Sequence, residues 1–415
     1  MTMWGGPVGP PPFFVYYTNM PRKILIFSLA YYPSFVSGAE GAIKDITDRI
    51  EPSDIEFHML TLLFDKSAPR YERIGNVHVH RVGFGGAYLS KILFIPLSAI
   101  QARLMHRKHK FDATWAMMTY MLMPLTLARW IGLKVPYLLT LQDGDPYDKV
   151  FGRWFVKPAL PVIDSGFRNA SIIQVISSYL GTWPEKRGYK GEVIKIFNGG
   201  NPRDFKNDIS AEELDELKQK LGKKENDVFL VNTARLVYQK GWDTTIKSLK
   251  LLPDNVKLLV VGNGNLDSEL KQLTKELGLE DRVIFTGAVE RSEVTKYRRV
   301  SDIFVMPSRS EGLGNAGLSA LASRLPLVAT QVGGMTEYVF QTEADSEYGK
   351  TAWVVNPDSP EEIAGAVNDI LGNPDKVEVV SNNARRMVEE KFHWDAIAKD
   401  MREKVFARVL ESSAN

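Results

Sequence analysis

Apolar, β-rich runs alternate with longer segments of helical period, and this alternation occurs twice along the chain. In the first half the apolar runs cover residues 23–29, 55–64, 77–82, 113–118, 137–143, 171–177 and 193–199. In the second half they cover residues 228–236, 256–262, 282–288, 302–308, 326–334 and 351–357. Continuous apolar strands that alternate with helices are typical of parallel sheets buried on both faces. The pattern predicts an α/β protein with two Rossmann-like domains.

A polar, charged segment over residues 201–227, which we call the linker, separates the two sets of strands and contains the domain boundary. We predict the first domain over residues 21–203 and the second over residues 204–390. Residues 391–415 carry an amphipathic pattern that predicts a terminal helix. Residues 1–20 lack the basic region and cleavage site of a signal peptide. Because they are rich in Pro and Gly, we predict that they form a disordered extension.

Composition excludes several classes of protein. The 415 residues include 52 Lys and Arg against 50 Asp and Glu, so the net charge of +2 lacks the basic excess of a general nucleic-acid binder. The absence of cysteine excludes disulfides, thiolate metal sites and thiol catalysis. No apolar run approaches the length of about 18 residues that spans a membrane. We therefore predict a cytoplasmic protein without a nucleic-acid partner.

Ligands of open α/β sheets bind at the carboxyl ends of the strands, so the residues that follow the strands are the candidates for a site. After the first strand, Gly38 and Gly41 open a helix and let backbone N–H groups come close to a ligand. The same residues fit a tight strand-to-helix turn without a ligand. Their spacing does not match the dinucleotide fingerprint, which argues against NAD.

In the second half, the first strand leads into a turn that Arg235 and Lys240 flank. Two cations over one strand end can hold a phosphate, because arginine grips two oxygens and lysine acts as a mobile charge. Two solvated surface cations are the alternative. The next strand ends in Gly262, which is good turn chemistry and only a weak ligand signal.

Glu311 follows the buried strand 302–308 and precedes an apolar helix. The first free N–H groups of such a helix point back toward the strand ends and favour an anion there. On position alone, Glu311 is a favourable acid before a helix. Gly312 and Gly314 favour a second role, because they leave room for a substrate whose hydroxyls Glu311 can bind.

These segments resemble the group 1 glycosyltransferases, which are retaining enzymes of the GT-B fold that use a nucleotide-sugar donor. The family signature of a Glu, an Ala-rich helix, Pro, a short strand and Gly-Gly reads here EGLGNAGLSALASRLPLVATQVGG. Further matches are SGAEGAIKDI, IKIFNGGNPRDF, ARLVYQKGWD and FHWDAIA, so the resemblance covers nearly the whole chain. It implies that the two domains face a central cleft and that the terminal helix crosses back to the first domain.

The resemblance also implies roles for single residues. Arg235 and Lys240 would hold the donor diphosphate and Glu311 the hydroxyls of the transferred sugar, which makes these three the catalytic residues. The turn at Val289 and Glu290 would hold the nucleotide base. The implied donor-binding residues are Gly38, Gln142, Gly262, Val289, Glu290, Gly312, Leu313, Gly314, Asn315, Ala316 and Ser319.

Three positions depart from the family pattern. Ser319 stands where the family has a second Glu that holds the ribose, Gln142 where a His is common, and Asn201 where an Asp is usual. Serine is shorter than glutamate and uncharged, so the departure predicts a weaker or relocated grip on the ribose.

The implied activity is retaining transfer of a hexosyl group from a nucleotide-sugar to a sugar or lipid-linked acceptor, in polysaccharide or glycolipid biosynthesis. No metal cofactor is implied, because Arg235 and Lys240 supply the positive charge that the leaving diphosphate needs. The alternative is a non-catalytic partner subunit that binds nucleotide-sugar, in which Ser319 and Gln142 mark lost chemistry. A nucleotide-sugar epimerase of the same architecture fits the motifs less well.

Residues 87–111 bear on the acceptor, because their apolar residues fall at helical spacing and their end is densely basic. The basic residues are Arg103, His106, Arg107, Lys108, His109 and Lys110. A basic amphipathic helix can lie on an anionic membrane surface, which would place the protein at the inner face of the membrane with a lipid-linked acceptor. A core-packed helix with a solvated cationic end fits equally well.

Overall fold

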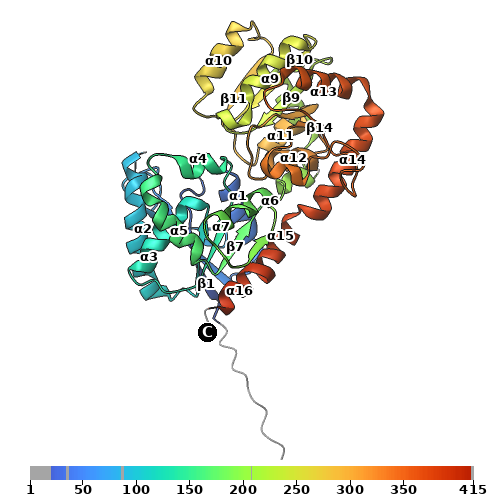
Figure 1. The fold of residues 1–415 in the computed structure, drawn as a ribbon. Helices are drawn as coiled ribbons and strands as arrows, with labels where there is room; N and C mark the ends of the chain where they lie inside the picture. The colour runs from blue at the N-terminus through green and yellow to red at the C-terminus, as the bar shows by residue number, and fades with distance from the viewer. Residues whose placement is uncertain (1–19, 34–36, 86–87, 207, 413–415) are drawn as a thin grey trace, which may run out of the picture.

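The computed structural model describes residues 20–33, 37–85, 88–206 and 208–412. Two α/β domains lie one above the other in Figure 1, and the last helices run back from the second domain to the first. The extension predicted over residues 1–20 lies outside the described residues, apart from the exposed Met20. The predicted domain boundaries stay a prediction, since the linker belongs to neither sheet.

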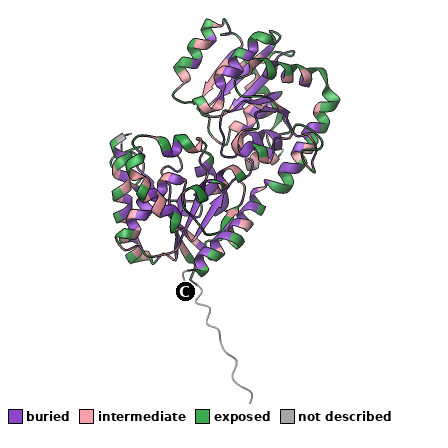
Figure 2. Ribbon diagram, viewed as in Figure 1, coloured by how far each residue is buried: buried purple, intermediate pink, exposed green. Residues whose placement is uncertain are grey.

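The first domain is built on an eight-stranded sheet of order β3-β4-β2-β1-β5-β6-β7-β8. Its strand pairs are parallel except β3 with β4, which are antiparallel. The strands are β1 (Arg22–Phe27), β2 (Ile55–Leu62), β3 (Tyr71–Ile74), β4 (Val77–Val82), β5 (Ala113–Met117), β6 (Tyr137–Leu141), β7 (Ile172–Val175) and β8 (Val193–Lys195). The central strands β5 and β6 are buried along their length and β1 from Ile24 onward, as the purple arrows of Figure 2 show.

The second domain is built on a six-stranded parallel sheet of order β11-β10-β9-β12-β13-β14. The strands are β9 (Val228–Thr233), β10 (Val256–Val261), β11 (Val283–Gly287), β12 (Ile303–Met306), β13 (Leu327–Ala329) and β14 (Trp353–Val354). Together the two sheets confirm the predicted α/β class with two Rossmann-like domains.

Helices cover both sheets and connect their parallel strands. In the first domain they are α1 (Gly38–Thr47), α2 (Tyr88–His109), η1 (Thr119–Met121), α3 (Leu122–Trp130), α4 (Tyr147–Gly152), η2 (Lys157–Ala159), α5 (Leu160–Arg168), α6 (Ser178–Gly181) and α7 (Trp183–Lys186). From the linker onward they are η3 (Pro202–Phe205), α8 (Ala211–Leu221), η4 (Tyr238–Lys240), α9 (Trp242–Ser248), η5 (Leu249–Leu251), α10 (Asp267–Glu276), α11 (Val294–Arg299), α12 (Asn315–Ala322), η6 (Gly333–Glu337), α13 (Pro360–Gly372), α14 (Pro374–Lys391), α15 (Trp394–Asp400), η7 (Met401–Phe406) and α16 (Ala407–Glu411).

The C-terminal helices α15, η7 and α16 pack on the first domain, which confirms the predicted crossing back (Figure 1). The ring of Phe406 lies 5.7 Å from that of Phe57 and 5.1 Å from that of Trp115, which belong to the first sheet. At the surface, Arg402 Nη2 donates to Asp54 Oδ1 over 2.7 Å. Burial of these aromatic rings and of aliphatic residues such as Met401 and Val405 stabilises the packing of the last helices on the first domain.

Within the described part of the chain, β3 is the strand that the apolar pattern did not predict. Its sequence Tyr-Glu-Arg-Ile is mostly polar, because it is an edge strand whose side chains are exposed or half-buried. An edge strand needs no apolar face on both sides, so it lacks the signal that identified the buried strands.

Helix α2 carries apolar residues on two sides. Phe94, Ala102 and Met105 are buried in the core of the first domain. On the opposite side, an exposed apolar stripe runs along the helix before the exposed cations Arg107 and Lys108. The apolar members of this stripe are Leu89, Ile92, Ile100 and Leu104. The helix is therefore packed on the core, as the alternative of a core-packed helix predicted. It also exposes apolar and basic residues, which the alternative of a membrane-surface helix requires.

Five of the six histidines gather where the end of α2 covers β2 and β4. They are His58, His78, His80, His106 and His109, and we name them the histidine cluster. His58 Nδ1 lies 3.3 Å from His80 Nε2, and His58 Nε2 lies 2.6 Å from Glu56 Oε1. Burial lowers the pKa of His58 to about 4 despite the hydrogen bond to the Glu56 carboxylate, and burial also lowers the pKa of His80 to about 4.

We expect the histidine cluster to make stability depend on pH between about 6.5 and 4. The folded pKa values lie below the unfolded value of about 6.5, so the unfolded state binds more protons and stability falls as pH falls through this window. For the buried His58 the loss is on the order of 3 kcal/mol once the pH is below 4. In thermal unfolding, the melting temperature of the double variant His58→Gln, His80→Gln should vary less with pH than that of the wild type.

The matched control is His393→Gln, because His393 lies outside the histidine cluster, as the N-cap residue of α15. This control should keep the wild-type slope of melting temperature against pH. A double variant that lost stability between pH 6.5 and 4 as steeply as the wild type would contradict the prediction.

Candidate functional site

Loops that follow the strand ends of both sheets touch one another. Ser177 Oγ, after β7, donates to the carbonyl of Gly312 over 2.6 Å, and Ser310 Oγ donates to the carbonyl of Gly144 over 3.0 Å. A Cβ atom at Gly312 would lie 2.6 Å from the carbonyl oxygen of Asp143, so only glycine allows this approach. The carboxyl ends of the two sheets therefore face each other around the sequence that contains Glu311.

Glu311 is buried, with 5% of its surface exposed, and its carboxylate is held on one side. Lys240 Nζ donates to Oε1 over 2.5 Å, and Ser308 Oγ donates to the same oxygen over 2.9 Å. The other oxygen, Oε2, accepts no hydrogen bond from the residues that the structure describes. The carboxylate is thus fixed in direction and keeps one acceptor oxygen for a ligand.

Gly333 and Gly334, the last two residues of the signature, pack against the backbone of Glu311 and Gly312. A Cβ atom at Gly333 would lie 2.0 Å from the carbonyl oxygen of Glu311, and one at Gly334 would lie 2.0 Å from that of Gly312. Gly334 N also donates to the carbonyl of Glu311 over 3.1 Å. Glycine is required here because two backbone segments are in direct contact, and this contact holds Glu311 in place.

Tyr338 fixes the start of α12. Its hydroxyl donates to the carbonyl of Gly314 over 2.9 Å, and a Cβ at Gly314 or Gly317 would collide with that hydroxyl. Burial, followed by the nearby Glu311 carboxylate, raises the pKa of Tyr338. Leu313 packs in the core, whereas Asn315 and Ala316 are half-buried at the helix start, where the first amides have no acceptor within the helix.

Arg235 and Lys240 belong to the same turn but have different surroundings. Lys240 contacts Glu311, while the guanidinium of Arg235 is exposed and forms no hydrogen bond or ion pair with the described residues. Gly262 packs against this turn, because a Cβ there would lie 2.1 Å from the carbonyl oxygen of Ala234. The structure thus gives Gly262 a role in backbone packing, and its predicted donor contact stays a prediction.

The first domain brings its own loops toward α12. A Cβ at Gly38 would lie 3.2 Å from Asn315 Nδ2, so the starts of α1 and α12 are neighbours. Gln142 exchanges hydrogen bonds with Asn198, the shorter one over 2.8 Å. The remaining predicted residues, Val289 and Glu290, lie on the turn after β11, where Val289 is half-buried and Glu290 exposed.

Three residues of this arrangement were not predicted from the sequence: Ser308, Tyr338 and Asp143. Ser308 is the last residue of the predicted strand 302–308, which was an available signal. Asp143 follows β6 in the same way; it is 4% exposed and accepts a hydrogen bond from Thr119 Oγ1 over 2.9 Å. Burial raises the pKa of Asp143 to about 6. Nothing in the sequence indicated the position of Tyr338.

Ser319 contacts the linker. Its Oγ accepts a hydrogen bond from the backbone N–H of Asn201 over 2.9 Å, and the side chain is buried. Two of the three departures from the family pattern therefore meet in one hydrogen bond.

We expect Ser319→Glu to lower the KM for the donor by about tenfold, because a carboxylate adds a charge-assisted hydrogen bond to the ribose hydroxyls. The kcat should change little, since the ribose is remote from the reacting bond. Initial-rate kinetics test this, with Ser319→Ala as the control that removes the hydroxyl without adding a charge. Loss of donor binding in Ser319→Glu alone would show that the ribose is held in another way.

Comparisons with known proteins agree with this geometry. Residues 213–387 match the family described as glycosyl transferases group 1. An uncharacterized glycosyltransferase of Methanocaldococcus jannaschii is 26% identical over 403 residues, which cover 91% of this chain and 96% of that protein. The GDP-mannose-dependent alpha-(1-6)-phosphatidylinositol monomannoside mannosyltransferase of Mycobacterium tuberculosis is 30% identical over 254 residues, or 58% of this chain and 63% of that protein.

Among solved structures, Anabaena HepE in complex with UDP-glucose has the same fold. It aligns with a TM-score of 0.75 over 93% of this chain and 99% of that one, at 22% sequence identity. The fold is that of the GT-B glycosyltransferases, and most of the second domain matches the group 1 family. The chain is similar to the group 1 glycosyltransferases.

Proposed function

We propose that the protein moves a hexosyl group from a nucleotide-sugar to an acceptor, with Arg235 and Lys240 on the diphosphate and Glu311 on the hydroxyls of the sugar. The observation that carries the proposal is the Glu311 carboxylate, buried and held by Lys240 and Ser308 through one oxygen while the other stays open. A buried carboxylate with a free acceptor oxygen suits a polar ligand such as a sugar, because an unmade hydrogen bond in a buried site is costly.

Electrostatics does most of the chemical work in this proposal. Cleavage of the bond between sugar and diphosphate builds negative charge on the leaving group. Arg235, Lys240 and the first amides of α12 stabilise that charge more than they stabilise the intact donor. The leaving phosphate takes the proton of the acceptor hydroxyl on the same face of the sugar, so no nucleophile of the enzyme is needed.

A thermal-shift panel of UDP-, GDP- and ADP-sugars tests the proposal most simply. A ligand that binds only the folded state raises the melting temperature. We expect one nucleotide class to raise the melting temperature of the wild type. It should not raise the melting temperature of the double variant Glu311→Ala, Arg235→Ala. A wild type that responds to no member of the panel would remove the support for a nucleotide-sugar enzyme.

For the acceptor, we propose a lipid-linked sugar at an anionic membrane surface. No helix in the described ranges is long and apolar enough to cross a bilayer. Instead, α2 exposes the apolar stripe defined above next to Arg107, Lys108 and the following Lys110. Apolar and basic side chains on one helix surface are the features that bind anionic lipid. The Mycobacterium tuberculosis relative is a phosphatidylinositol monomannoside mannosyltransferase, which also supports a lipid-linked acceptor.

Co-sedimentation with vesicles of phosphatidylglycerol and phosphatidylcholine tests the membrane surface. We expect binding to be lost when Arg107, Lys108 and Lys110 are replaced by glutamine. The matched control replaces Lys220, Lys224 and Lys250, which are exposed on the second domain, and should bind like the wild type. Wild-type protein that ignored anionic vesicles would remove this acceptor proposal and leave the donor proposal intact.

The alternative of a non-catalytic nucleotide-sugar-binding subunit makes a different prediction. Such a protein binds the donor and releases no sugar from it. Measurement of nucleoside diphosphate release from the donor that responds in the panel separates the two, because a transferase shows slow hydrolysis even without its acceptor.

A further inference from the structure

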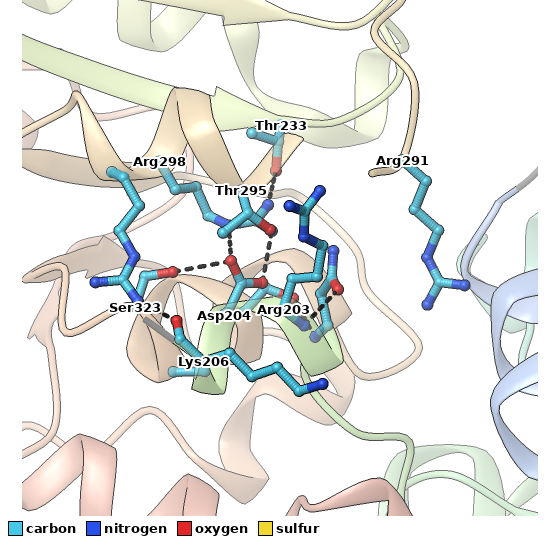
Figure 3. Close-up of polar contacts among 12 residues, drawn as sticks. Arg203, Asp204, Lys206, Thr233, Arg291, Thr295, Arg298 and Ser323 are labelled. Atoms are coloured by element: carbon cyan, nitrogen blue, oxygen red, sulfur yellow. Dashed lines mark hydrogen bonds and ion pairs between the residues drawn. The ribbon is translucent and has the colours of Figure 1, made fainter. Parts of the chain in front are cut away.

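Arg291 belongs to the second domain, and its side chain contacts the first domain. It follows the turn of Val289 and Glu290 directly, and Arg291 Nη2 donates to Asp45 Oδ2 of α1 over 2.5 Å. Arg291 Nη1 donates to the hydroxyl of Tyr32, after β1, also over 2.5 Å. In Figure 3 its side chain points away from the cluster around Asp204 and toward the neighbouring helix. One guanidinium thus joins the turn after β11 to two elements of the first domain.

The sequence of α1 is adapted to this arginine. A Cβ atom at Gly41 would lie 3.1 Å from the guanidinium carbon of Arg291, which is tighter than an ordinary contact. Glycine at position 41 therefore leaves room for the guanidinium on the surface of α1. Glu40, between the two glycines of the motif, caps its own helix by accepting from the Ser37 N–H over 2.7 Å.

The ion pair is shielded mainly on its carboxylate side, since 36% of the Arg291 side chain is exposed, and it continues into a longer chain of charges. Only 11% of the Asp45 side chain is exposed. Asp45 Oδ1 lies 3.6 Å from Arg49, and Arg49 Nε donates to Asp395 of α15 over 2.7 Å. Arg291 therefore belongs to a network that also includes the C-terminal helix. A shielded pair of this kind is costly to break, because one charge is left without its partner.

The loop that carries Arg291 is held from its other side by the linker. Arg203 Nη1 donates to the carbonyl of Ser292 over 2.5 Å. Arg203 is itself placed by its neighbour Asp204, which is fully buried and paired with Arg298 Nη2 over 2.6 Å and with Ser323 Oγ over 3.0 Å (Figure 3). The loop thus contacts the linker on one side and α1 on the other.

We propose that Arg291 is a positioning residue that couples the nucleotide-binding turn to the closure of α1 over the donor. The proposal rests on the proposed function, because the turn of Val289 and Glu290 is its nucleotide-binding part. When the nucleotide holds this turn, Arg291 holds Asp45 and thereby keeps Gly38, at the start of α1, beside Asn315 at the start of α12. Arg291 touches no reacting atom and acts through α1.

Small-angle X-ray scattering of the full chain without ligand tests the contact independently of any donor. We expect Arg291→Ala to have a larger radius of gyration than the wild type, because the two domains separate more often. The conservative Arg291→Lys should give an intermediate value, since lysine can pair with Asp45 but cannot also reach Tyr32 as a fork. Arg299→Ala is the matched control, because Arg299 donates to the linker carbonyl of Lys206 and does not reach the first domain.

Kinetics with UDP-glucose and GDP-mannose test the coupling. We expect kcat with the accepted donor to fall about 10- to 100-fold in Arg291→Ala, since small misplacements of reacting groups have effects of this size. The KM for the donor should change less than about threefold, because the diphosphate contacts of Arg235 and Lys240 remain. If Arg291→Ala has the larger radius of gyration but the wild type shows no activity with either donor, the result would support the contact and count against the proposed function. An unchanged radius together with unchanged kcat would overturn the inference, whatever donor is used.

Discussion

Replacing Arg235 by alanine is expected to abolish sugar transfer and to leave the fold unchanged. Loss of a preorganised group that stabilises developing negative charge costs about 2.7–4 kcal/mol of transition-state stabilisation, which is roughly a 100- to 1,000-fold loss of kcat. The side chain is exposed and has no partner among the described residues, so its removal breaks no contact within the protein. Steady-state transfer assays and thermal unfolding measure the two parts of this prediction.

Arg324→Ala is the matched control, because Arg324 is an exposed arginine of the same domain at the far end of α12. It should keep wild-type transfer and wild-type melting temperature. Near-normal turnover in Arg235→Ala would show that the diphosphate lies elsewhere. A large drop in melting temperature in that variant would show that Arg235 has a structural partner.

Lys240→Ala is expected to differ from Arg235→Ala by losing stability as well as transfer. Lys240 is the ion-pair partner of Glu311, whose side chain is 6% exposed. Removing one member of a buried ion pair costs about 3–5 kcal/mol, because the remaining charge stays buried without compensation. Ser308 alone cannot replace a positive charge, since a hydroxyl donates a single neutral hydrogen bond.

The double variant Lys240→Met, Glu311→Gln separates the structural effect from the catalytic one. It removes both charges, so chemical denaturation should recover most of the stability that Lys240→Ala loses, while transfer stays absent. A Lys240→Ala variant as stable as the wild type would contradict the buried pair. Recovery of transfer in the double variant would contradict the role of Glu311 on the sugar.

The sequence was sufficient to predict the two sheets except for β3, one of the two edge strands of the first sheet. Parallel strands are buried on both faces and therefore appear as apolar runs, which is why β1 and β12 were evident. The polar strand β3 carries no such signal. The crossing of the terminal helix was predicted through the family resemblance, and its cause, the packing of Phe406 between Phe57 and Trp115, needed the structure.

For the site, the pattern identified residues but not their contacts. Glu311 and Lys240 were both expected near the donor, yet they are 71 positions apart, and no local period links them. Gly333 and Gly334 were recognised as part of a signature, and the structure supplies the reason, which is their contact with the backbone of Glu311 and Gly312. Arg291 was not singled out, because its partners belong to the other domain.

Calorimetric titration of the diphosphate and monophosphate of the responding nucleoside tests the central claim most directly. If Arg235 and Lys240 hold the diphosphate, the wild type should bind the diphosphate at least about tenfold more tightly than the monophosphate, a difference of about 1.4 kcal/mol. In Arg235→Ala this preference should shrink to within a few-fold. Equal binding of both nucleotides by the wild type, or a full preference kept by Arg235→Ala, would contradict the account.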